Sequence, residues 1–197
     1  VDVFFVLSGF LITRIIAEDL RAGRWSVANF YERRIRRIVP ALVFVGACST
    51  VAAIAILLPS ELQAYAASLL AAALSLSNIW FASMTGYFDP AAATQPLLHT
   101  WSLGIEEQFY VAFPLLLSLA YRFGQKGVSL FVCGAFAVSL AMSIALTPDD
   151  PRSAYFLIHT RAWELLLGSV VALGLVPASA RMWQREIASA LGLLAIA

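Results

Sequence analysis

Apolar residues are grouped into long runs along this chain, and short stretches between the runs carry most of the charge. The runs cover residues 1–17, 39–58, 64–81, 102–121, 128–146 and 155–175, and a further run begins at residue 186. A helix needs about 20 consecutive apolar residues to cross a bilayer. The strands of a membrane barrel would instead alternate apolar and polar positions over about 10 residues. The pattern therefore predicts an all-α, polytopic transmembrane helical bundle, because helices satisfy their own backbone in lipid.

Composition indicates the same class of protein. Of the 197 residues, 61% are hydrophobic and 13% are charged, and the mean hydropathy is +0.83. These values are far too apolar for a soluble domain. The net charge of +1 does not point to a nucleic-acid partner. Cys48 and Cys133 lie in separate apolar runs with no spacing typical of a disulfide or a metal site, so we expect both to be small core residues.

Both ends of the sequence lie inside apolar runs, at Val1 and Ala197. We therefore expect the chain to be part of a longer membrane domain that continues at both ends. Ser8 and Gly9, in the middle of the first run, are small enough to favour close contact with another helix.

The placement of charge predicts which side of the membrane the loops occupy. Residues 18–37 carry six arginines against three acidic residues, so the positive-inside rule makes this loop cytoplasmic. The second span, residues 39–58, follows at once, and Pro40 is expected at its first helical turn, where a missing N–H costs nothing.

Residues 64–81 are weakly hydrophobic and leave two topologies open. If they span, the loop around Asp89 is cytoplasmic although it has no Lys or Arg, and the basic loop at 122–126 faces outside. If they are re-entrant or lie on the outer face, the basic loops at 122–126 and 181–185 are cytoplasmic and the acidic turn at 149–150 is external. We favour the second topology because it satisfies every loop with one rule.

An apolar stripe and four arginines share the helix predicted for residues 26–40 (SVANFYERRIRRIVP). At about 100° per residue, Arg34 lies inside the stripe and Arg37 at its edge, whereas Arg33 and Arg36 point away from it. The stripe consists of Val27, Phe30, Tyr31, Ile35 and Ile38. A charge among apolar side chains needs an anion or a polar cavity. Since guanidinium groups pair with phosphate in bidentate fashion, a nucleotide-containing donor is favoured over mere orientation and lipid binding.

The densest group of polar residues at membrane depth lies in residues 98–114 (LHTWSLGIEEQFYVAFP). Ser102, Glu106 and Tyr110 recur every four residues on one helix face, while Glu107 lies about 100° away. A carboxylate in a span costs roughly 2.5 to 3.5 kcal/mol, so Glu106 is a candidate site residue. Pro114 is expected to leave the Tyr110 carbonyl without a donor. The alternative is an interfacial cap, with His99 before the helix and Trp101 and Tyr110 as belt aromatics.

A second polar pair lies in residues 155–168 (YFLIHTRAWELLLG). Arg161 and Glu164 are three residues apart, and Gly168 shares their face. Such a pair neutralises itself, so a structural ion pair and a functional one are equally compatible with the pattern. His159 lies on another face, and we interpret it as structural.

Four segments together resemble a known family: VDVFFVLSGFLI, FYERRIRRIVP, LLHTWSLGIEEQFY and TRAWELLLG, in this order over nearly the whole chain. They are similar to the membrane acyltransferase 3 family, which O-acetylates bacterial surface polysaccharides. The resemblance implies a single membrane acyltransferase domain of the bacterial inner membrane. It implies an enzyme that moves an acyl group, usually acetyl, from cytoplasmic acyl-CoA to a hydroxyl of a cell-envelope glycan such as a polysaccharide or lipopolysaccharide. It implies no metal.

The resemblance also implies roles for individual residues. The family's arginine pair falls on Arg34 and Arg37, implying contact with the phosphates of CoA. The family's Trp-Ser-Leu element is followed by a carboxylate that falls on Glu106 rather than on Glu107. This implies that Glu106 either supports catalysis or binds sugar hydroxyls, and we favour sugar binding. The substrate-binding residues implied or suggested by position are Ser8, His99, Trp101, Ser102, Tyr110, Arg161 and Glu164.

One departure from the family pattern concerns the catalytic base. The family's first helix carries an arginine and a histidine, the latter being the likely base, and neither His99 nor His159 occupies that position. We expect that histidine before Val1, and we therefore expect this chain to be inactive alone. A soluble domain beyond Ala197 is compatible with the sequence. The competing hypothesis is a transporter or flippase in which Glu106, Arg161 and Glu164 form a relay; the lack of an inverted repeat weakens it.

Overall fold

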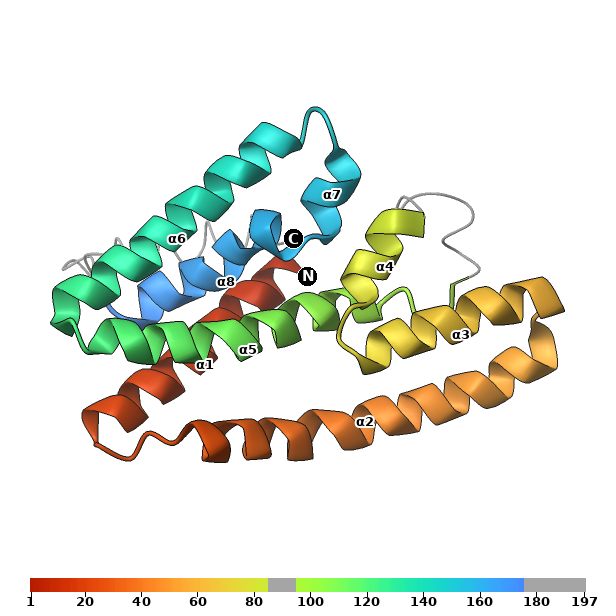
Figure 1. The fold of residues 1–197 in the computed structure, drawn as a ribbon, viewed down its shortest axis with the longest axis horizontal. Helices are drawn as coiled ribbons and strands as arrows, with labels where there is room; N and C mark the ends of the chain where they lie inside the picture. The colour runs from red at the N-terminus through yellow and green to blue at the C-terminus, as the bar shows by residue number, and fades with distance from the viewer. Residues whose placement is uncertain (85–94, 176–197) are drawn as a thin grey trace, which may run out of the picture.

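The fold is a bundle of helices, seen in a computed structural model that describes residues 1–84 and 95–175 (Figure 1). The described residues form eight α-helices and no strand, so the all-α prediction is confirmed. The helices are α1 (Asp2–Arg21), α2 (Val27–Ile56), α3 (Pro59–Ala73), α4 (Ser77–Met84), α5 (Thr100–Tyr121), α6 (Gly124–Leu146), α7 (Pro151–Phe156) and α8 (Ile158–Ala172). The predictions for Asp89, for residues 181–185 and for the run from residue 186 lie outside the described residues.

Three of the described helices are long and apolar enough to cross a membrane: α2, α5 and α6. The expected spans at 102–121 and 128–146 correspond to α5 and α6. Helix α1 has 20 residues but carries charges at both ends, from Asp2 to Arg21, and its span stays a prediction.

Two of the apolar runs are interrupted by a break between helices. Residues 64–81 are divided between α3 and α4 at Ser75, whose φ of 57° stops the first helix. Residues 155–175 are divided between α7 and α8 at Leu157, which has extended backbone angles. The prediction of one continuous span over residues 155–175 is therefore wrong, and the alternative in which residues 64–81 form one spanning helix is not supported. For the first run, a segment without a full-length helix is what the favoured topology requires, although its sidedness stays a prediction.

Helices α1 and α8 make the tightest contact of the bundle at two glycines. A Cβ added to Gly9 would overlap the backbone of Leu165, whose carbonyl carbon lies only 2.6 Å from it. A Cβ added to Gly168 would lie 2.6 Å from the backbone nitrogen of Phe10. Close backbone approach at small residues is how membrane helices gain packing energy when lipid is as apolar as their side chains. The prediction of close contact at Gly9 is thus confirmed.

Helix α5 runs through the middle of the bundle and connects its parts (Figure 1). Its buried residues Trp101, Ile105 and Leu117 belong to the main core, together with Phe5 of α1 and Leu165 of α8. A partly buried polar contact joins α5 to α4, where the Gln108 amide donates to Asn78 Oδ1 at 2.8 Å. Helix α5 therefore holds its side chains in a fixed position relative to α1, α4 and α8.

Helix α2 runs along the lower edge of the bundle in Figure 1. Its far end is joined to α3 by a hydrogen bond of 2.9 Å between Thr50 and Tyr65, and near its start the Tyr31 hydroxyl donates to the Val111 carbonyl of α5 at 2.7 Å. Pro40 lies inside this continuous helix, so the prediction of a helix start there is wrong. Proline removes one backbone hydrogen bond, and membrane helices tolerate this loss.

Cys48 and Cys133 are exposed on the bundle surface, so their interpretation as core residues is wrong. The physical reason is that the outer surface of a membrane bundle faces lipid, where a small apolar side chain is as stable as in the core.

Candidate active site

Two neighbouring cavities lie between α1, α2 and α5, with volumes of about 570 and 640 Å³. Both are lined by Phe4 of α1, by Arg37 and Ile38 of α2, and by Leu103 and Glu106 of α5. We call the first the histidine cavity, because His99 lines it, and the second the arginine cavity, because Arg33 and Arg34 line it. The shared wall makes them two parts of one groove.

Glu106 stands in the shared wall and has a partner on α1. The Ser8 hydroxyl donates a hydrogen bond of 2.7 Å to Glu106 Oε1. Ser8 and Glu106 are 98 positions apart in the sequence, so packing of α1 beside α5 creates this pair. A carboxylate at membrane depth needs such a donor or a polar cavity, and Glu106 has both. Glu107 does not line either cavity.

Arg34 lies in the arginine cavity with its guanidinium over the ring of Tyr110, 3.8 Å from the ring centroid. A cation stacked on an aromatic face is held in orientation while its N–H donors stay available at the edge. Arg37 is more exposed and lines both cavities. The inward placement predicted for Arg34 and Arg37 therefore agrees with the structure.

The apolar stripe predicted for α2 is only partly inward. Phe30 is 3% exposed, whereas Ile35 is 59% exposed and Val27 also lies at the surface. The inward face of α2 is rotated from the predicted apolar stripe toward the arginines. Arg33 lines the arginine cavity, so the prediction that Arg33 points away is wrong. Lipid accepts apolar side chains, which means that polar side chains mark the inside of a membrane helix. Arg36 does point away and pairs with Glu32 at 2.8 Å.

The histidine cavity has a polar end formed by residues at the start of α5. His99 and Ser102 line it, and the Ser102 hydroxyl donates to the His99 carbonyl at 3.3 Å. The rest of its wall is mainly apolar, with Ala41, Leu42 and Val45 of α2 opposite α5. His159 is exposed and lines neither cavity.

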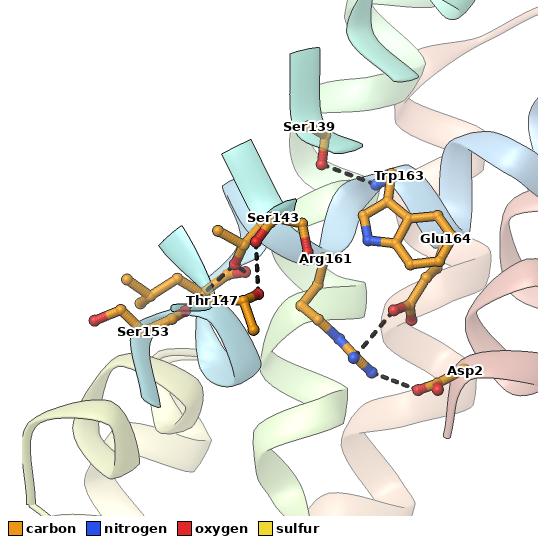
Figure 2. Close-up of polar contacts among 10 residues, drawn as sticks. Asp2, Ser139, Ser143, Thr147, Ser153, Arg161, Trp163 and Glu164 are labelled. Carbon is orange, nitrogen blue, oxygen red and sulfur yellow. Dashed lines mark hydrogen bonds and ion pairs between the residues drawn. The ribbon is translucent and has the colours of Figure 1, made fainter. Parts of the chain in front are cut away.

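Arg161 and Glu164 form a second cluster (Figure 2). Neither residue lines the two cavities. Glu164 is 1% exposed, and its Oε1 lies 3.1 Å from Arg161 Nη1, while Arg161 also pairs with Asp2 of α1. The rings of Phe5 and Trp101 flank the Arg161 guanidinium at 5.6 and 5.8 Å. Trp101 is buried in the core rather than in a cavity wall. Phe5, which lines the histidine cavity, stands between the two clusters.

Comparison with known proteins identifies the family of this chain. The family model described as an acyltransferase domain matches residues 1–197. The chain belongs to this acyltransferase family. It is 35% identical to an uncharacterized protein of Haemophilus influenzae, over 87% of this chain and 73% of that protein. It is also 35% identical to the O-acetyltransferase OatA of Staphylococcus aureus, over 87% of this chain and 29% of OatA.

A further relative is the Bacillus subtilis protein named "Putative peptidoglycan O-acetyltransferase YrhL", which is 34% identical over 88% of this chain and 28% of its own length. The chain thus spans less than a third of each of the two named relatives. No solved structure matches it.

Sequence reasoning missed two features of this acyltransferase family member. It did not include Arg33 in the site, although Arg33 and Arg37 are four residues apart and hence on one face. It also missed Asp19, which lies 3.5 Å from Arg33 and 4.0 Å from Arg24. No group of three His, Cys, Asp or Glu side chains suited to a metal ion occurs among the described residues.

Proposed function

We propose that the chain is part of a membrane O-acyltransferase that moves an acyl group, namely acetyl, from cytoplasmic acyl-CoA to a hydroxyl of a cell-envelope glycan. Membership of the acyltransferase family supports the reaction class. The names of OatA and YrhL support an acetyl group, and the name of YrhL supports a cell-wall acceptor. The donor and the sidedness are part of the proposal.

The observation that carries the proposal is the pair of adjoining cavities with different chemistry. The arginine cavity offers guanidinium groups that suit the phosphates of CoA. The histidine cavity offers small polar groups, from His99, Ser102 and Glu106, that suit the hydroxyls of a sugar. Residues 99 and 110 are separated by about 16 Å along a helix, so the two ends of the groove lie at different membrane depths. Two substrates that approach from opposite sides would meet near Glu106.

The reaction joins the acceptor oxygen to the acyl carbonyl carbon and breaks the carbon–sulfur bond of the thioester. The proton of the acceptor hydroxyl moves to a base and then to the sulfur. CoA therefore leaves as the thiol. In this scheme Arg34 and Arg37 hold the phosphates, and Glu106, oriented by Ser8, accepts a hydrogen bond from the acceptor.

A transporter relay receives less support from the geometry. Glu106 lines the groove, whereas Arg161 pairs with both Glu164 and Asp2 on the other side of Phe5. These three residues therefore do not form one path in the described part of the chain.

The test is acetyl transfer by membrane vesicles that contain the full protein, supplied with radiolabelled acetyl-CoA on the cytoplasmic side. Wild-type vesicles should incorporate base-labile label into envelope glycan. Glu106→Gln should lower incorporation at least about tenfold, because the hydrogen bonds of a carboxylate are among the strongest. Glu107→Gln is the matched control and should keep wild-type incorporation, since Glu107 lines neither cavity. Wild-type vesicles without labelled ester would refute the proposed function.

A further inference from the structure

The arginine cavity contains one more cation than a phosphate pair requires. Arg33, Arg34 and Arg37 all line it, and they come from one turn and a half of α2. Arg33 and Arg36 are both exposed and both face a carboxylate, yet only Arg33 lines the cavity. The structure thus separates two arginines that the sequence presents as equivalent.

The contact between Arg33 and Asp19 leaves Arg33 available to a ligand. Its Nη2 lies 3.5 Å from Asp19 Oδ2, which is longer than the 2.7 to 2.9 Å usual for a charge-assisted hydrogen bond. Asp19 also lies 4.0 Å from Arg24. By contrast, Arg36 is engaged with Glu32 at 2.8 Å. Asp19 can therefore hold Arg33 at the rim of the cavity while the guanidinium keeps free donors.

The chemistry of CoA supplies a reason for three cations. Its pyrophosphate carries two phosphates in diester-type linkage, and its ribose carries a third as a 3′-phosphate monoester. A phosphate monoester bears a charge of about −1.5 to −2 at neutral pH, and it gains most from an added guanidinium. The third phosphate is attached at the nucleotide end of CoA, and Arg33 is the most N-terminal of the three arginines. Its position at the exposed rim suits that end of the donor.

We propose that Arg33 binds the 3′-phosphate of CoA and so makes the site selective for CoA donors over donors that lack this group. The inference rests on the proposed function, because it assumes that the arginine cavity holds the donor. It assigns Arg34 and Arg37 to the pyrophosphate and Arg33 to donor selectivity. Arg33 therefore does not touch the reacting atoms.

The experiment compares the binding of CoA and 3′-dephospho-CoA to the purified full protein by calorimetry. Wild-type protein should bind CoA about tenfold or more tightly than dephospho-CoA, the usual effect of a hydrogen bond between charged groups. Arg33→Gln should bring the two dissociation constants close together by weakening CoA alone. Arg34→Gln should weaken both ligands, and Arg36→Gln, the matched control, should keep the wild-type ratio.

The outcomes separate this inference from the proposed function. If Arg33→Gln weakens both ligands equally, or changes neither, the assignment of the 3′-phosphate is wrong while the donor site stands. If wild-type protein binds neither ligand, or if Arg34→Gln binds both as wild type does, the proposed donor site is wrong and the inference falls with it. Thermal unfolding of the same samples checks whether the three variants are folded as the wild-type protein is.

Discussion

The two sides of α1 show the difference between a contact that builds the bundle and one that builds a site. On one side Gly9 meets the backbone of α8 so closely that no side chain fits. On the other side Ser8, the neighbouring residue, faces the groove and donates to Glu106. The first contact is closed, while the second leaves cavities lined by charged residues. We therefore propose that adjacent positions of one short motif serve stability and chemistry separately.

One of the two largest effects should come from closing the glycine contact. Gly9→Ala places a methyl group against the Leu165 backbone, which cannot move without shifting α8. We expect a loss of about 3 kcal/mol or more in the free energy of unfolding, measured by thermal unfolding in detergent. Gly134→Ala on α6 is the control, because a Cβ there meets nothing within 4 Å. Wild-type stability of Gly9→Ala would mean that α1 and α8 are not packed this way.

The ion pair of α8 offers a second effect of similar size. Arg161→Gln leaves Glu164 buried without its cation, and breaking a buried pair on one side costs about 3 to 5 kcal/mol. The double variant Arg161→Gln with Glu164→Gln should recover most of that loss. If the double variant is stable and still transfers acetyl, the pair is structural. If it is stable but inactive, Arg161 and Glu164 bind substrate, as the sequence resemblance implies.

Ser8→Ala sharpens the comparison most directly within the motif. It removes the 2.7 Å hydrogen bond to Glu106, and we expect acetyl transfer to fall about tenfold. Thermal stability should change little, because Ser8 borders a cavity rather than α8. Ser118→Ala is a matched control, since that hydroxyl bonds only the carbonyl of its own helix, at Leu115. If Ser8→Ala loses stability but transfers acetyl at the wild-type rate, Ser8 serves packing and not the site.

Sequence pattern was sufficient for the helices whose limits coincide with long apolar runs, such as α5 and α6, because length and hydropathy decide a span. It failed where a single residue changes the backbone inside an apolar run, as at Ser75 and Leu157. Hydropathy averages over about 20 residues and does not register such a break.

For the site, side-chain chemistry was more informative than apolar periodicity. The carboxylate of Glu106 and the arginines of α2 were singled out as candidates because charge is costly at membrane depth. Ile35 was misplaced because a lipid-facing side chain and a core side chain look alike in sequence. The pairing of Ser8 with Glu106 depends on two helices that are far apart in the chain.

The most direct test of the groove as the transfer site compares two variants, Arg34→Gln and Arg36→Gln. The measurement is the rate of acetyl transfer from labelled acetyl-CoA in vesicles, at donor concentrations below saturation. Arg34 lies in the arginine cavity, and Arg36 lies on the same helix outside it. We predict a fall of at least about tenfold for Arg34→Gln and a change within about twofold for Arg36→Gln, whose ion pair is exposed. Equal rates in the two variants would contradict the account.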